Sequence, residues 1–200
     1  MIAHRGASWD LPENTLPAFE RAIELGADYV EFDVHARRDG ALVVTHGPPR
    51  DRAGLPMLEQ VLALCRGRIG VMVELKTPYR YRRHDVITRT LAILDDEAVV
   101  VCFQPGALEE VRRLRPGLRT VQHVGYGVSV RRAAAAWAAG FENSRATPRA
   151  IRHAQALGLE TAVYTVNEPT RMLELAGLGV TGIFTDRPEL ARLTLAQLRG

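Results

Sequence analysis

The sequence contains few cysteines, a single lysine and no long apolar segment. Its two cysteines, Cys65 and Cys102, stand among apolar residues, which excludes a disulfide framework and predicts two buried thiols. No apolar run approaches the roughly 20 residues that a membrane-spanning helix needs. The first residues carry neither the basic nor the apolar region of a secretion signal. We therefore expect a cytoplasmic protein without a transmembrane segment.

The composition is that of an ordinary globular protein. Hydrophobic residues make up 46% and charged residues 24% of the 200 positions, which excludes a disordered chain. A chain of this length can bury a full hydrophobic core, so we expect one domain over residues 1–200. The net charge is only +3. A short basic and aromatic run at residues 79–83 therefore favours attraction of an anionic substrate over nucleic-acid binding.

Short apolar runs rich in β-branched residues recur along the chain and predict buried strands. They are Met1–His4, Tyr29–Val34, Leu42–Thr45, Gly70–Leu75, Ala98–Phe103, Thr120–Val124, Glu160–Val166, Gly182–Thr185 and a weaker run near Phe141. Amphipathic segments lie between most of these runs, and several begin beside a proline and end at a glycine, as helices do. They are Thr15–Leu25, Leu58–Cys65, Asp85–Leu94, Ala107–Leu114, Val130–Ala139, Pro148–Leu157, Pro169–Leu175 and Pro188–Leu198.

This alternation of strands and helices predicts a parallel sheet with helices on its outside. A doubly wound sheet and a closed (β/α)8 TIM barrel both have this pattern. The nine candidate strands are one more than the barrel holds, and their sequences leave open which one is surplus. At 200 residues the chain is at the lower limit for a barrel, so its loops must be short.

Polar side chains cluster where the first four predicted strands end. They are His4, Arg5, Glu31, Asp33, His46, Glu74 and Lys76. Glu31 and Asp33 are two residues apart, so both point to the same side of a strand, and Glu74 and Lys76 repeat this arrangement. Because the carboxyl ends of parallel strands form the active face of α/β proteins, we expect these side chains to converge.

Three members of this cluster are carboxylic acids. Three neighbouring carboxylates cannot all stay ionised unless a cation neutralises them. Glu31, Asp33 and Glu74 would offer oxygen ligands to one divalent cation such as Mg²⁺, Ca²⁺ or Mn²⁺. The alternative is an ion-paired layer of the same acids with Arg5 and Lys76, which needs no metal.

The other members of the cluster suit phosphodiester chemistry. Arg5 offers a fork of donors to phosphate oxygens, and Lys76, the only lysine beside 25 arginines, offers a point charge. Of the two imidazoles, His4 and His46, one can deprotonate the nucleophile while the other protonates the leaving alkoxide. Together with a metal ion that binds the phosphoryl oxygens, the cluster predicts a phosphodiesterase.

Ordered motifs run through nearly the whole chain. They are His4-Arg5-Gly6-Ala7, Pro12-Glu13-Asn14-Thr15, Ala18-Phe19, Gly26-Ala27-Asp28, Glu31-Phe32-Asp33-Val34, Asp39-Gly40, Val43-Val44-Thr45-His46, Glu74-Leu75-Lys76, Thr165-Val166-Asn167 and the run from Gly179 to Pro188. In this order they resemble the glycerophosphodiester phosphodiesterase family. The resemblance implies a TIM barrel that hydrolyses small-molecule glycerophosphodiesters to glycerol 3-phosphate and an alcohol.

The resemblance also implies roles for the clustered residues. The implied acid–base pair is His4 and His46, and the implied phosphate ligands are Arg5 and Lys76. The implied ligands of one divalent cation are Glu31, Asp33 and Glu74.

Two of the departures of this chain from the family pattern follow the third predicted strand. The family usually has aspartate after its second histidine, whereas His46 is followed by Gly47. The stretch after Arg52 is shorter than in the family, so we expect a short loop after the third strand and an open mouth. An open mouth could admit lysophospholipids, which makes lysophospholipase D-type hydrolysis one alternative. A degenerate barrel that binds phosphorylated ligands without hydrolysis is another, although all seven clustered residues are intact.

Overall fold

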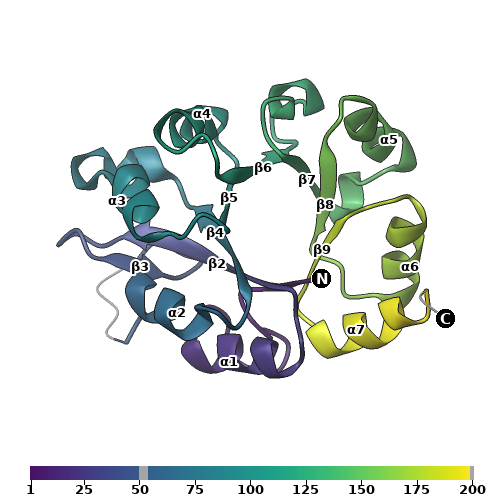
Figure 1. Cartoon of the computed structure of the whole chain (residues 1–200), viewed down its shortest axis with the longest axis horizontal. Helices are drawn as coiled ribbons and strands as arrows, with labels where there is room; N and C mark the ends of the chain where they lie inside the picture. The colour runs from purple at the N-terminus through teal and green to yellow at the C-terminus, as the bar shows by residue number, and fades with distance from the viewer. Residues whose placement is uncertain (50–53, 199–200) are drawn as a thin grey trace.

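Eight parallel strands close into a barrel, and the helices surround it (Figure 1). The structure is a computed structural model that describes residues 1–49 and 54–198. The barrel strands are β1 (Ile2–His4), β2 (Tyr29–Ala36), β4 (Gly70–Leu75), β5 (Val99–Cys102), β6 (Arg119–Val124), β7 (Ala138–Glu142), β8 (Glu160–Tyr164) and β9 (Gly182–Thr185). The sheet closes because β1 pairs in parallel with both β2 and β9. The predicted TIM barrel is therefore confirmed, and the open, doubly wound alternative is wrong.

The surplus strand is β3 (Leu42–Val44), which lies outside the barrel and runs antiparallel to β2. β2 continues past the end of its pairing with β4, which stops at Val34, and its last residues pair with β3 instead. Leu42–Thr45 is therefore the surplus candidate, which the nine sequences had left open. Only residues 37–41 connect the two strands, and a parallel crossover needs a dozen or more. The weak run near Phe141 is the barrel strand β7.

Seven α-helices and three short 3₁₀ helices fill the connections in the described residues. The α-helices are α1 (Leu16–Glu24), α2 (Leu58–Cys65), α3 (Val86–Ile93), α4 (Pro105–Leu114), α5 (Pro148–Ala156), α6 (Pro169–Gly177) and α7 (Pro188–Ala196). The 3₁₀ helices are η1 (Pro78–His84), η2 (Val130–Ala133) and η3 (Asn143–Arg145). Four α-helices begin with proline, and the Thr15 and Thr147 hydroxyls accept hydrogen bonds from first-turn N–H groups.

The predicted helix Val130–Ala139 is wrong over most of its length. Only η2 forms at its start, and β7 begins at Ala138. The Trp137 N–H already donates to the Thr120 carbonyl oxygen of β6 (3.0 Å), and β7 then pairs with β6 and β8. Strand pairing on both sides outweighs the helix preference of the alanines at 133–136.

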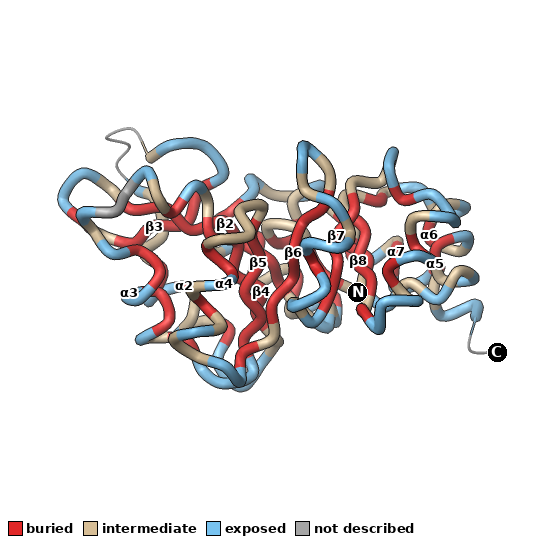
Figure 2. The backbone as a smooth tube through the Cα atoms, turned by 90° about the horizontal axis from the view of Figure 1, so that it is seen from above, coloured by how far each residue is buried: buried red, intermediate tan, exposed pale blue. Residues whose placement is uncertain are grey.

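The barrel strands are buried and the outer segments are exposed (Figure 2). One apolar cluster fills the barrel: Ile2, Met72, Val99, Val101, Val121, Ala138, Ala162 and Phe184. The alternate residues of the strands pack outward against the helices. Cys65 and Cys102 are free and buried, as predicted, and burial raises the pKa of both thiols to about 12.

One predicted loop includes residues that the structure does not describe. The predicted short loop after the third strand, residues 53–55 following Arg52, begins among residues 50–53, which lie outside the described residues. Across the part of the chain that the structure describes, no helix is long and apolar enough to cross a bilayer.

Candidate active site

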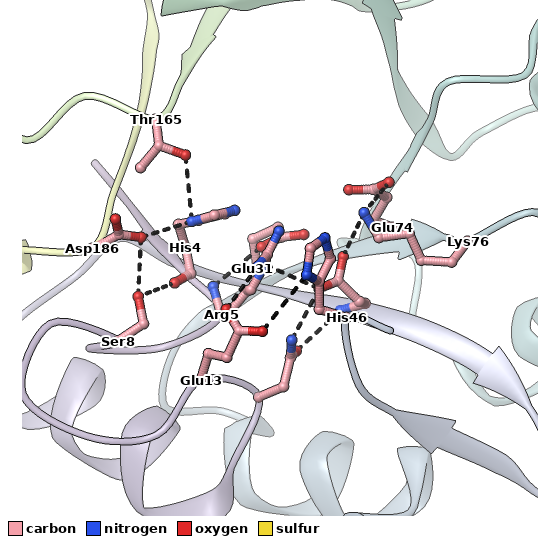
Figure 3. A network of polar contacts seen from close by, with 12 residues as sticks. His4, Arg5, Ser8, Glu13, Glu31, His46, Glu74, Lys76, Thr165 and Asp186 are labelled. Carbon is pink, nitrogen blue, oxygen red and sulfur yellow. Dashed lines mark hydrogen bonds and ion pairs between the residues drawn. The ribbon is translucent and has the colours of Figure 1, made fainter. Parts of the chain in front are cut away.

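The predicted cluster assembles at the carboxyl end of the barrel (Figure 3). A cavity of about 140 Å³ opens there, and six of the seven predicted residues line it. Asp33, the seventh, is fully buried and forms ion pairs with Arg5 and Lys76. The lining residues are His4, Arg5, Glu31, His46, Glu74, Lys76, Phe103, His123, Tyr164 and Phe184. A larger, mainly apolar hollow of about 320 Å³ lies at the opposite end of the barrel and contains no comparable cluster.

The three acids come from two adjacent strands. Glu31 and Asp33 lie on β2, and Asp33 is directly opposite Glu74 of β4 in the parallel register. One carboxylate oxygen of each acid lies within 4.8 Å of the others. The Lys76 Nζ is 3.0 Å from Asp33 Oδ1 and 2.7 Å from Glu74 Oε1. The period-two geometry of the strands thus brings all three carboxylates and the lysine to one point.

Burial gives the acids different proton affinities. Burial, followed by the charges of Asp33 and Glu74, raises the pKa of Glu31 well above its ordinary value. Burial also raises the pKa of Glu74 to about 7, although Lys76 opposes this shift. For Asp33, burial acts in the same direction, but the charges of Lys76 and Arg5 outweigh it and lower the pKa. Arg5 and Lys76 therefore compensate the negative charge of Glu31 and Glu74 less fully than that of Asp33.

The donor set fits a hard divalent cation. All three groups are carboxylates, which are the ligands that Mg²⁺, Ca²⁺ and Mn²⁺ prefer. Glu31 accepts a hydrogen bond from the Arg5 backbone N–H (3.1 Å), but among the described side chains it has no ion-pair partner. Lys76 and Arg5 alone therefore leave one buried carboxylate uncompensated. A bound cation would supply the missing charge.

A tight turn after β1 aims the Arg5 side chain at this cluster. Arg5 and Gly6 both have positive φ angles, +58° and +86°. A Cβ on Gly6 would lie only 2.7 Å from the Ala18 backbone, so glycine is required there. Arg5 Nε lies 3.1 Å from Asp33 Oδ2, and its Nη1 lies 2.7 Å from Glu13 Oε2. The guanidinium is thereby fixed at the rim of the cavity.

His4 ends β1 and is oriented by Asp186, which follows β9 (Figure 3). The His4 Nδ1 is 2.7 Å from Asp186 Oδ1, and Asn167 Nδ2 donates to Asp186 Oδ2 at 2.7 Å. Burial opposes ionisation of Asp186, but hydrogen bonds from His4, Asn167 and Ser8 lower its pKa to about 2. Because ionised Asp186 can only accept, Nδ1 of His4 carries a proton. Nε2 therefore remains for a ligand.

His46 reaches the cavity through the β2–β3 hairpin. The Thr45 N–H donates to the Asp33 carbonyl oxygen (2.9 Å), which holds the next residue, His46, beside the acids. Its ring is half exposed, and its Nδ1 lies 3.7 Å from Glu13 Oε1. Burial, followed by the charge of Arg5, lowers the pKa of His46. The imidazole is therefore neutral at neutral pH.

Aromatic side chains form the other wall of the cavity. His123 packs between Phe103 and Tyr164, with ring centroids 4.5 and 4.2 Å away. Burial, followed by the charge of Lys76, lowers the pKa of His123 to about 3, so this imidazole stays neutral. The wall is apolar in character, unlike the ionic wall opposite.

Sequence analysis assigned no role to three residues of the site: Glu13, His123 and Asp186. Asp186 directly follows the last predicted strand, as Arg5 follows the first strand. The search for polar side chains at strand ends identifies Asp186 when it is extended beyond the first four strands. It also identifies His123, which lies one residue before the end of the run Thr120–Val124. Glu13 lies in the loop after β1 and has no comparable signal.

A charged cavity at the carboxyl end of a closed parallel barrel is the active-site architecture of TIM-barrel enzymes. Comparison with known proteins identifies the kind of enzyme. A model of the glycerophosphoryl diester phosphodiesterase family matches residues 4–61 and 55–190. The Bacillus subtilis protein YqiK is 30% identical, covering 98% of both chains. A glycerophosphodiester phosphodiesterase of the same bacterium is 27% identical, covering 94% of this chain and 84% of its own.

Solved structures have the same fold. A glycerophosphodiester phosphodiesterase from Parabacteroides distasonis is 27% identical with a TM-score of 0.86, covering 100% of this chain and 97% of its own. An Oleispira antarctica phosphodiesterase, solved with its product sn-glycerol-3-phosphate, is 21% identical with a TM-score of 0.86 and covers 98% and 96%. The chain belongs to the glycerophosphoryl diester phosphodiesterase family and is a phosphoric diester hydrolase.

Proposed function

We propose that a single domain over residues 1–200 hydrolyses glycerophosphodiesters to glycerol 3-phosphate and an alcohol, with one divalent cation. The observation that supports this proposal most strongly is the cavity, in which two imidazoles flank a buried triad of carboxylates beside Arg5 and Lys76. The product-bound Oleispira antarctica relative supports glycerol 3-phosphate as the product.

In this proposal the ionic wall binds the phosphate. Glu31, Asp33 and Glu74 hold the cation, which supplies charge stabilisation to the phosphoryl oxygens when it is bound. Arg5 and Lys76 supply further positive charge from the same wall. Asp33 forms ion pairs with both Arg5 and Lys76, so the positions of these two side chains are set before the substrate binds.

The two imidazoles divide the proton transfers. His46 is neutral because its pKa is lowered, which suits a general base that accepts the proton of the nucleophile. His4 donates through Nδ1 to ionised Asp186, which orients the ring and leaves Nε2 for a general acid. His4 donates its Nε2 proton to the leaving alkoxide, while His46 keeps the proton of the nucleophile.

A product assay on metal-stripped protein tests the proposal. Glycerophosphocholine, glycerophosphoethanolamine and lysophosphatidylcholine would each be supplied with Mg²⁺, Ca²⁺ or Mn²⁺, and phosphomonoester release followed. We expect metal-restored release from the first two substrates. Faster release from lysophosphatidylcholine would favour lysophospholipid hydrolysis instead, and ligand binding without product would favour the binding-only barrel.

Variants separate the two histidines. His4→Ala and His46→Ala should both lose turnover while metal binding persists, whereas His153→Ala, on the exposed surface of α5, should be unaffected. A substrate with a nitrophenol leaving group needs no general acid, so it should restore activity to His4→Ala and not to His46→Ala. Equal restoration of both variants would contradict the assignment.

A further inference from the structure

One segment of the chain combines several arginines with almost no acidic residue. The whole chain has 26 basic and 23 acidic residues. Residues 126–159 contain five of the arginines and a single acidic residue, Glu142, so the rest of the chain has a slight excess of acid.

The structure gathers these arginines on one face. Arg131 and Arg132 lie on η2, and Arg149 and Arg152 lie on α5, which packs beside it on the outside of the barrel (Figure 1). All four side chains are exposed, and none forms an ion pair with a described carboxylate. Arg149 and Arg152 line a shallow hollow of about 600 Å³ with His153.

The two elements that carry these arginines are packed firmly on the hydrophobic core. Ile151 and Ala154 of α5 are fully buried, and Ala133 of η2 is buried in the same apolar cluster. Val130 and Ala150 pack against that cluster from the two elements. Because the apolar sides of η2 and α5 are buried, these arginines lie on the solvent-exposed side.

The charged face continues to the mouth of the active site. Arg145 of η3 lies just before α5; it forms an ion pair with Glu142 (3.4 Å), and its guanidinium lies 5.0 Å from the ring centroid of Tyr126. Tyr126 is 69% exposed, and its ring lies 6.4 Å from that of Phe103, which lines the catalytic cavity. An exposed tyrosine among arginines, at the edge of an active site, is suited to the boundary between water and lipid.

We propose that Arg131, Arg132, Arg145, Arg149 and Arg152 form a docking face for the anionic head groups of a phospholipid bilayer. Exposed arginines, four of which form no ion pair with a described carboxylate, complement a surface of many small negative charges. Tyr126 continues this face to the rim of the active-site mouth. A nucleic acid is the other polyanion that such charges attract, and it provides the contrasting arm of the test.

The test measures binding without turnover, so its result is independent of the proposed hydrolysis. The full chain would be sedimented with vesicles of phosphatidylcholine alone or with one quarter phosphatidylglycerol, at low and high salt. We expect binding only to the anionic vesicles and only at low salt. Arg149→Gln/Arg152→Gln should weaken this binding roughly ten- to thirtyfold.

The matched control is Arg112→Gln/Arg113→Gln, which removes the same charge from the last turn of α4. It should bind within about twofold of the unmodified protein, and both variants should keep full activity on glycerophosphocholine. Three results would overturn the proposal: no preference for anionic vesicles, equal losses in the two double variants, or tight binding of a 20-base-pair DNA duplex without vesicle binding.

Discussion

Replacing Asp186 by asparagine should disable His4 without disturbing the metal site. Asn167 Oδ1 accepts from the Asp186 N–H (2.9 Å) and lies 3.0 Å from the Thr185 hydroxyl, so its Nδ2 must point to Asp186 Oδ2. An asparagine side chain at position 186 therefore has two orientations, and both are unfavourable. Its NH₂ group faces either the Asn167 NH₂ group or the Nδ1 of His4. The second choice makes Nδ1 an acceptor, so the ring loses the Nδ1–H hydrogen bond to a charged carboxylate that orients it.

The size of the effect follows from the interaction that is lost. Both side chains are mostly buried, with 17% and 27% exposed, so solvent screens the pair little. A hydrogen bond to a charged group contributes about 1.5–3 kcal/mol. At 1.36 kcal/mol for each factor of ten, kcat should fall about 10- to 150-fold.

Steady-state kinetics and metal-binding calorimetry would measure this outcome. Asp186→Asn should keep its metal affinity, because Asp186 does not contact the carboxylate triad. Ser8→Ala, which removes a neutral donor to the same carboxylate, should lose less than about tenfold. In a His4→Ala background the Asp186 change should add nothing. A variant that keeps more than about a third of kcat, or loses metal binding, would refute the reasoning.

Two further predictions concern the triad and the aromatic wall. Metal binding must displace protons from Glu31 and Glu74, whose pKa values are raised, to about 7 for Glu74. Affinity should therefore fall with decreasing pH below about 7, about tenfold per unit for each proton released, and calorimetry at pH 5.5–8 would detect it; a flat profile would contradict the raised values. Gly140→Ala would place a Cβ 2.3 Å from Nδ1 of His123, which is boxed in by aromatic rings, and should lower the free energy of unfolding by about 1–3 kcal/mol. Gly117→Ala, which meets no atom within 4 Å, is the control in urea unfolding, and equal effects would exclude the packing explanation.

Much of the site could be predicted because its signals are local. A strand alternates its side chains, so the two-residue spacing of Glu31 and Asp33 was enough to place both carboxylates on one side. The burial of an apolar strand around them indicated that a cation was needed. The seven predicted residues converge for this reason, and the motif resemblance led to the same set.

Other features depend on which segments meet, which local pattern does not encode. Leu42–Val44 reads as a strand in isolation, and only its pairing with β2 shows that it lies outside the barrel. The alanines before β7 favour a helix until β6 and β8 bind the following residues on both sides. Strand character was local, whereas strand position was set by the partners.

The sequence by itself determined the alternating architecture, the buried acids and the family. Closure of the barrel decided the rest, because it joins β1 to β9 and so brings Asp186 to His4 across 182 positions. Closure of the barrel also places His123 in the aromatic wall, opposite Lys76. Such contacts exist only once the sheet has closed, since no spacing along the chain relates their partners.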